Sequence, residues 1–104
     1  MTYVKVGTIQ DIPDKKMKEY RVNGKVVAVA NIKGQFKAFD GFCTHAHCSL
    51  AGGFLDGSTL TCYCHGAQFD ISNGKVLAPP ATTDLNTYPV KLEGNDILVG
   101  IKEE

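Results

Sequence analysis

Hydrophobic and polar residues alternate along much of the chain with a period of two, which is typical of strands whose successive side chains point to opposite faces of a sheet. The clearest cases lie near the C-terminus, where most apolar residues take every second position of segments 88–92 and 97–101. Gly94-Asn95 stands between these segments and predicts a turn. No long stretch shows the 3.6-residue period of an amphipathic helix. The pattern therefore predicts an all-β protein.

Turn-forming dipeptides divide the first half of the chain into strands. Asn23-Gly24 separates MKEYRV from KVVAVANI, and Asn-Gly between apolar runs is a strong hairpin signal. Lys33-Gly34 then separates KVVAVANI from QFKAF. The run Val26–Ile32 is apolar at nearly every position, which predicts a strand buried on both faces. We expect an antiparallel fold of short strands closed into a small sandwich or barrel.

Length and charge limit the organisation of the chain and its partners. A chain of 104 residues can bury its own core, so residues 1–104 are predicted to form a single domain. The 11 Lys and Arg balance the 11 Asp and Glu, so no basic field predicts binding to nucleic acid or to an anionic membrane. The sequence shows neither a signal peptide nor an apolar run of transmembrane length. We therefore expect a soluble, cytoplasmic protein with no membrane anchor.

All the cysteines and histidines fall in two short segments, CTHAHC at 43–48 and CYCH at 62–65. Thiolate and imidazole groups gathered in this way predict a metal site, and in the cytoplasm metal binding is a better explanation of clustered cysteines than disulfides alone. Both segments stand next to turn signals, so they are expected to be facing loops at one end of the β framework. Seven donor side chains exceed the needs of one four-coordinate ion.

Zinc is one interpretation of these segments. A structural Cys₂His₂ zinc site usually pairs cysteine with cysteine and histidine with histidine, whereas here Cys43 is paired with His45 and Cys62 with His65. A zinc site made of the four cysteines would leave three histidines without a role. The mixed spacing suits two adjacent metals, with each loop giving its cysteine to one and its histidine to the other. A zinc-stabilised binding module remains the alternative.

The two segments and the flanking AQFDISNGKVLAPPA resemble the Rieske family, in which two histidines replace two cysteines on one iron of a 2Fe–2S cluster. The resemblance covers essentially the whole chain and is strongest to the Rieske-type ferredoxins that serve ring-hydroxylating dioxygenases. It implies one 2Fe–2S cluster, with Cys43 and Cys62 on the inner iron and His45 and His65 on the outer iron.

The same resemblance implies a Rieske-like β-sandwich or barrel with a small cluster-binding subdomain of loops, at about residues 41–50, 62–67 and 77–82. The third of these contains Pro79-Pro80 and would, from the residues alone, be interpreted as a connector.

The implied function is that of a one-electron carrier and not of an enzyme. It would take electrons from a flavin-containing, nicotinamide-linked reductase and pass them to a terminal oxygenase or another acceptor, as a monomer. Two other family roles compete with this one, the quinol-oxidising Rieske component of a respiratory complex and the small subunit of an assimilatory nitrite reductase. Such nitrite reductase subunits often lack the ligands that are present here.

Cys48 and Cys64 stand where Rieske proteins of cytochrome bc complexes carry a disulfide between the cluster loops. The resemblance therefore implies a Cys48–Cys64 disulfide and favours the respiratory interpretation. The alternative is that both are reduced, buried and act as small hydrophobic residues. His47 is interpreted as an exposed loop histidine.

Two positions after the second segment argue against the respiratory role. The cytochrome bc proteins have serine and tyrosine where this chain has Ala67 and Phe69, and their hydroxyls donate hydrogen bonds that favour the reduced cluster. Ala67 and Phe69 cannot donate such bonds. The implied potential lies in the lower half of the Rieske range of about −150 to +300 mV.

Overall fold

The computed structural model describes residues 2–43, 48–64, 66–79 and 81–101 of the chain. This part consists of short strands joined by turns: β1 (Thr2–Thr8), β2 (Met17–Val22), β3 (Lys25–Ile32), β4 (Gln35–Asp40), β5 (Phe54–Asp56), β6 (Thr59–Thr61), β7 (Gln68–Asp70), β8 (Lys75–Ala78), β9 (Thr87–Tyr88), β10 (Val90–Glu93) and β11 (Asp96–Ile101). Its helices are single 3-10 turns, η1 (Ile9–Asp11) and η2 (Leu50–Gly52). Within the described residues no helix is long and apolar enough to span a membrane.

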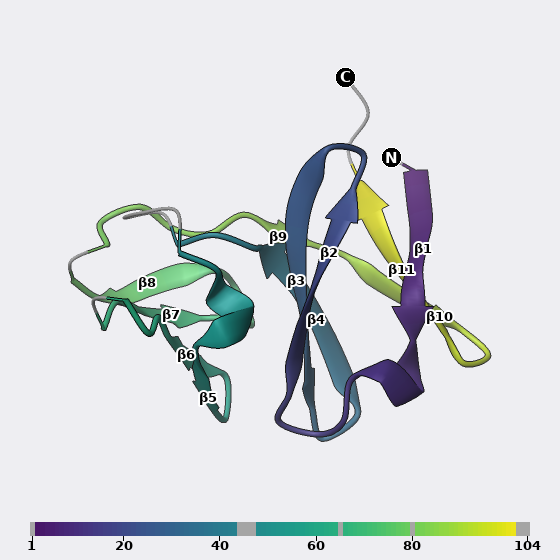
Figure 1. The fold of residues 1–104 in the computed structure, drawn as a ribbon, viewed down its shortest axis with the longest axis horizontal. Helices are drawn as coiled ribbons and strands as arrows, with labels where there is room; N and C mark the ends of the chain where they lie inside the picture. The colour runs from purple at the N-terminus through teal and green to yellow at the C-terminus, as the bar shows by residue number, and fades with distance from the viewer. Residues whose placement is uncertain (1, 44–47, 65, 80, 102–104) are drawn as a thin grey trace.

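The strands form three antiparallel sheets, with the orders β1-β11-β10, β2-β3-β4-β9 and β5-β6-β7-β8. The first two sheets lie together, and the third extends to one side of them (Figure 1). We call residues 41–86, which contain the third sheet, the insert, and the remainder of the chain the base. The predicted all-β, antiparallel fold class is confirmed, although what the resemblance describes as a subdomain of loops also contains a four-stranded sheet.

The turns follow from residues that accept positive φ. Asn23 and Gly24 have φ of 51° and 80°, as the two central residues of a type I′ turn require, and they join β2 to β3. Lys33 and Gly34 repeat this geometry between β3 and β4. Both predicted hairpins are confirmed.

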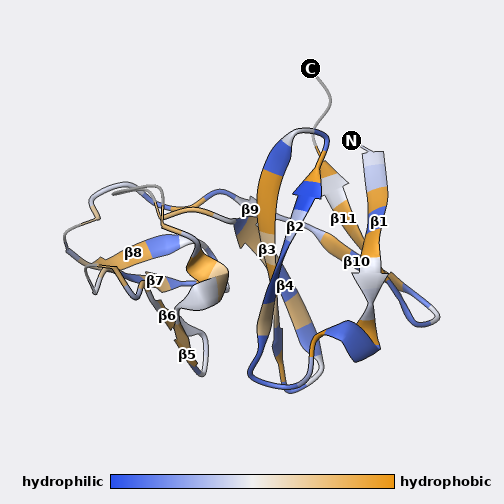
Figure 2. Ribbon diagram, viewed as in Figure 1, coloured by the Kyte–Doolittle hydropathy of each residue, from blue (hydrophilic) through white to orange (hydrophobic). Residues whose placement is uncertain are grey.

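Strand β3 belongs to two hydrophobic cores at once. Val27 and Val29 pack into the core of the base, whereas Ala28 and Ala30 point to the other face and pack into the core of the insert. All four are completely buried. Figure 2 shows that β3 is hydrophobic over most of its length. The prediction of a strand buried on both faces is confirmed, because the insert covers the face that the base leaves open.

The C-terminal alternation also forms strands, on either side of the predicted turn at Gly94-Asn95. Ile97, Val99 and Ile101 are buried in the base core. Leu92, by contrast, is 47% exposed, because β10 is an edge strand of its sheet. The period of two therefore identified the strands but not how far each side chain is buried.

The two ends of the insert meet at one point of the base. The backbone N–H of Asp40 donates to the carbonyl of Asn86 (2.9 Å), and the N–H of Asn86 donates to Oδ2 of Asp40 (2.9 Å). The hydroxyl of Tyr88 donates to Oδ1 of the same carboxylate (2.6 Å), and burial together with this bond raises the pKa of Tyr88. Asp40 thus fixes the place where the chain enters and leaves the insert.

Candidate metal centre

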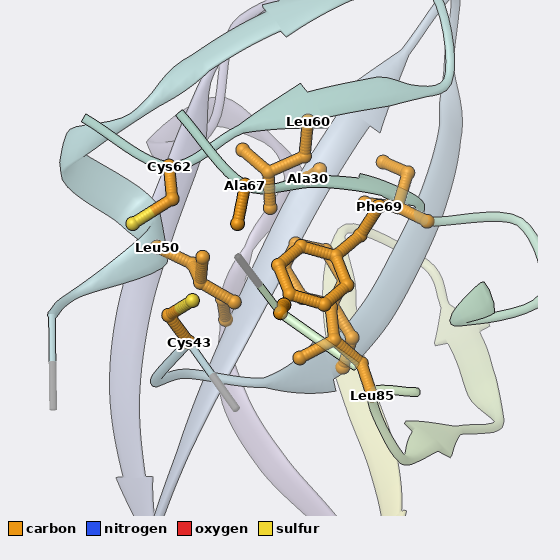
Figure 3. Close-up of a cluster of buried hydrophobic side chains, with 12 residues drawn as sticks. Ala30, Cys43, Leu50, Leu60, Cys62, Ala67, Phe69 and Leu85 are labelled. Carbon is orange, nitrogen blue, oxygen red and sulfur yellow. The ribbon is translucent and has the colours of Figure 1, made fainter. Parts of the chain in front are cut away.

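Two reduced cysteines lie at one end of the insert core. Cys43 follows β4, Cys62 follows β6, and their side chains are 6% and 2% exposed. Figure 3 shows both sulfur atoms at the same end of the core, beside Leu50. The fold therefore brings together the cysteine predicted from each segment. His45, His47 and His65 lie outside the described residues, and their roles remain predictions.

Backbone hydrogen bonds close each cysteine loop. In the first loop, the N–H of Cys43 donates to the carbonyl of Cys48 (3.0 Å), and the N–H of Leu50 donates to that of Gly41 (2.9 Å). Gly41 has no room for a side chain, because a Cβ there would collide with Val26 of the base. The first loop is therefore held directly against the N-terminal end of β3.

The second loop connects β6 to β7. The N–H of Cys62 donates to the carbonyl of Ala67 (2.8 Å), and the N–H of Gly66 donates to that of Cys62 (3.1 Å). Gly66 has a φ of 77°, which glycine adopts without strain. Ala67 and Phe69, which follow this turn, are completely buried in the insert core.

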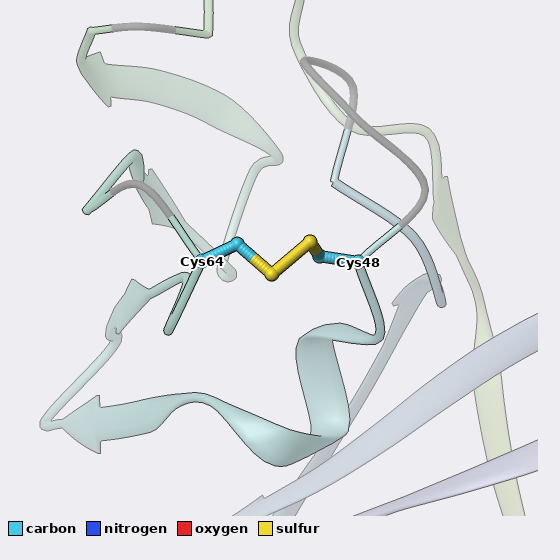
Figure 4. The surroundings of a disulfide bond; sticks show 2 residues. All are labelled: Cys48 and Cys64. Carbon is cyan, nitrogen blue, oxygen red and sulfur yellow. A yellow bond between two sulfur atoms is a disulfide. The ribbon is translucent and has the colours of Figure 1, made fainter.

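A disulfide between Cys48 and Cys64 joins the two loops (Figure 4). Their Cα atoms lie 6.5 Å apart, inside the range that a disulfide spans. The Sγ atom of Cys62 lies within 4.8 Å of both disulfide sulfurs. These three sulfurs do not form a metal-binding triad, because a disulfide offers no thiolate. The same bond removes two ligands from the zinc site of four cysteines that was considered from the sequence.

The donors that remain fit an iron–sulfur centre. Cys43 and Cys62 come from facing loops and are surrounded by apolar side chains such as Leu50 and Phe69. Soft thiolate ligands suit iron–sulfur clusters, and a buried thiolate is costly unless a positive group compensates its charge. Their burial therefore agrees with metal ligation.

The third loop, residues 77–82, packs on the same core. Ala81 and Leu85 are nearly fully buried in the insert core, and the N–H of Leu85 donates to the carbonyl of Gly74 (2.7 Å). The side chain of Asp84 accepts a bond from the N–H of Val76 (2.9 Å). Pro80 lies outside the described residues. Ala81 of the loop and Leu85 just beyond it thus line the insert core, which the proline-rich sequence alone did not indicate.

Tyr63 is a feature of the second loop to which the sequence assigned no role. It lies between Cys62 and Cys64, and its ring packs over Gly52, where a Cβ would come within 3.1 Å of a ring carbon. The side chain is nevertheless 54% exposed. No pattern in the sequence marked it, because the contact joins residues from two loops.

Comparisons with known proteins agree with this geometry. The model of the Rieske [2Fe-2S] domain matches residues 2–89. The ferredoxin component of the naphthalene 1,2-dioxygenase/salicylate 5-hydroxylase systems of Ralstonia sp. is 35% identical over 97 residues, which cover 93% of each protein.

Solved structures agree as well. A chain from the complex of reduced oxygenase and oxidised ferredoxin in carbazole 1,9a-dioxygenase superposes with a TM-score of 0.87 at 30% identity, over 93% of this chain and 91% of that one. The plasma membrane Rieske protein PetC3 of Synechocystis PCC 6803 superposes with a TM-score of 0.73 at 35% identity, over 94% and 99% of the two chains.

Proposed function

This chain belongs to the Rieske 2Fe–2S family, and we propose that Cys43 and Cys62 hold one iron of its cluster and His45 and His65 the other. The burial of both cysteines in facing loops supports the thiolate half of this assignment. The C-x-H spacing of the first segment and the C-x-C-H spacing of the second support the histidine half. His47 is then an exposed residue without a ligand role. The cluster-binding loops are 41–50, 62–67 and 77–82.

The protein is an electron carrier of the kind that multicomponent dioxygenases use, and its relatives are named as ferredoxin components of such systems. We propose that it accepts electrons from a flavin-containing reductase and passes them to a terminal oxygenase. The observation that carries this function is the pair of buried, reduced cysteines beside the disulfide-linked loops, in a chain similar to dioxygenase ferredoxins over nearly its whole length. We also propose that it works as a cytoplasmic monomer.

The bound cluster would supply a one-electron couple, and the residues of the chain set its charge and its access. Two thiolates and two neutral imidazoles leave the oxidised site with less negative charge than four thiolates would, so it accepts an electron more readily. Cys43 and Cys62 face the core, so a redox partner cannot approach from their side. His45 and His65 would therefore form the side through which electrons enter and leave.

The experiment that tests the ligand set is electron paramagnetic resonance of the reduced protein. We expect a rhombic signal of mixed nitrogen and sulfur ligation. Cys43→Ala, Cys62→Ala, His45→Ala and His65→Ala should each abolish this signal, whereas His47→Ala should preserve it. A normal signal from Cys62→Ala would contradict the assignment.

Quinol oxidation in a respiratory chain is a second candidate function. It is favoured by the disulfide between the loops and by the likeness to the Synechocystis plasma membrane Rieske protein. Ala67 and Phe69 argue against it, because neither supplies a hydroxyl. A measured potential near the top of the Rieske range would favour this second function over the first.

A further inference from the structure

Three of the four cysteines form one group of sulfur atoms. The Sγ atoms of Cys48, Cys62 and Cys64 all lie within 4.8 Å of one another, although only Cys48 and Cys64 are bonded. Cys62 is a reduced thiol at 2% exposure and is therefore shielded from reagents in solvent. Among the described residues, the disulfide lies within 4.8 Å of its Sγ atom. A thiolate next to a disulfide is the arrangement from which thiol–disulfide exchange proceeds.

We propose that Cys62, when it holds no metal, exchanges with the neighbouring disulfide. The thiolate of Cys62 attacks Sγ of Cys48, a Cys48–Cys62 bond forms, and the Cys48–Cys64 bond breaks. Cys64 leaves as a thiolate and takes up the proton that Cys62 has given to water. One disulfide and one thiol are present before and after, so the step requires neither an oxidant nor a reductant.

Burial gives this exchange its direction. Cys62 is almost completely buried, whereas Cys64 is only partly buried. Exchange places the neutral disulfide at the buried position and the ionisable thiol at the more accessible one, where water can solvate its thiolate. Attack on Cys64 would instead close a ring between cysteines separated by a single residue, and it would leave the two loops unlinked. Attack on Cys48 keeps the loops joined.

The exchange would regulate loading of the metal centre. This consequence rests on the proposed ligand role of Cys62. A chain with a Cys48–Cys62 bond lacks one thiolate ligand, so it cannot take up a cluster until the bond is reversed. In a chain with a bound metal, Cys62 is a ligand and cannot attack, so the Cys48–Cys64 disulfide is kept. The three cysteines therefore make cluster loading and the disulfide pattern mutually dependent.

The test compares disulfide patterns in cluster-loaded and cluster-free protein from the same iron-limited culture. Both fractions are purified without added thiol under anaerobic conditions, trapped with N-ethylmaleimide in denaturant, and analysed by mass spectrometry. Chymotrypsin cleaves after Tyr63, which separates Cys62 from Cys64. We expect the loaded fraction to give Cys48–Cys64. The cluster-free fraction should lose that peptide and give Cys48–Cys62 with labelled Cys64.

Cys43 is the internal control and should carry the label in both fractions. Cys62→Ser, which has no attacking thiol, should keep the Cys48–Cys64 bond without a cluster. A cluster-free wild-type fraction that keeps Cys48–Cys64 with labelled Cys62 would overturn the proposal, as would a disulfide that contains Cys43. Failure of the ligand assignment is distinguishable, because Cys62→Ala would then retain the resonance signal whatever the disulfide pattern.

Discussion

The strands of the base reach eight residues in β3, whereas those of the insert have three or four. The base is held by long backbone ladders and a core of branched aliphatic side chains such as Ile97 and Val99. The ladders of the insert are shorter, with three residue pairs between each two neighbouring strands. The insert adds a disulfide and the close packing of its glycine turns. The region that presents metal ligands therefore adds covalent and local constraints to its buried core, whereas the base combines its buried core with long ladders.

This difference predicts that the base can be weakened without loss of the metal centre. Ile97→Ala removes a completely buried side chain from the base core and should lower the free energy of unfolding by about 2–5 kcal/mol. The visible spectrum of the cluster should be unchanged in the folded protein. Denaturant unfolding measures the first effect, and Leu92→Ala, at the exposed edge strand, is the matched control. A bleached spectrum in folded Ile97→Ala protein would show that the two regions are not separable in this way.

Removal of the disulfide tests whether the insert depends on this covalent bond for its stability and for retention of the cluster. The bonded cysteines are 16 residues apart, and closing a loop of about that length stabilises a protein by ~3 kcal/mol. The double variant Cys48→Ser/Cys64→Ser should lose stability of this order and should also release its cluster faster on dilution into chelator. Stopped-flow bleaching gives the release rate. A release rate equal to that of the wild type would mean that the short ladders alone hold the loops.

Hydroxyl groups next to the centre should shift the potential. Phe69→Tyr and Ala67→Ser each offer a donor within the insert core, and a differential stabilisation of about 1–2 kcal/mol corresponds to roughly 40–90 mV for one electron. We expect both substitutions to raise the potential, as measured by protein-film voltammetry. Phe36→Tyr adds the same hydroxyl to the base core and should leave the potential unchanged. An equal shift from all three would show that the effect is not local.

The smallest effect is expected at the edge of the base. Oδ2 of Asp11 accepts a hydrogen bond from the N–H of Thr8 (3.0 Å), which lowers the pKa of this carboxyl below 3.8. Its contribution to stability is present above the unfolded-state pKa and is lost as pH falls through the lower folded-state pKa. Asp11→Asn should therefore be slightly less stable than the wild type at neutral pH, and the difference should vanish in strong acid. Asp56→Asn, on the exposed edge of the insert, is the control in urea unfolding at both pH values.

The parts of the molecule that sequence patterns predicted are those with a signal in consecutive residues of the chain. Asn23-Gly24 specifies its hairpin through local backbone conformation, and the apolar run of β3 reports burial on both faces. The insert sheet escaped prediction, because strands of three residues such as β5 and β7 are too short to show a period.

The candidate site divides in the same way. The spacing of Cys43 and Cys62 within their segments indicated the chemistry, but the approach of Cys62 to the Cys48–Cys64 bond arises from the meeting of two loops. The packing of the third loop on the insert core is likewise a long-range contact, and its proline-rich sequence gives no local sign of it. Contacts between distant segments were accessible only from the folded chain.

Asp40 and Asn86, at the two ends of the insert, are joined by two hydrogen bonds. The gap that the insert bridges in the base is therefore small enough for a short loop. Segments attached in this way tolerate insertion, deletion and exchange, because the scaffold strands need not move when the segment changes. Electron-transfer properties can therefore change through the insert loops, while the contact of the insert core with β3 is kept. For protein engineering, residues 41–86 can be exchanged as one cassette, provided that the new segment also covers Ala28, Ala30 and Phe39 of the base.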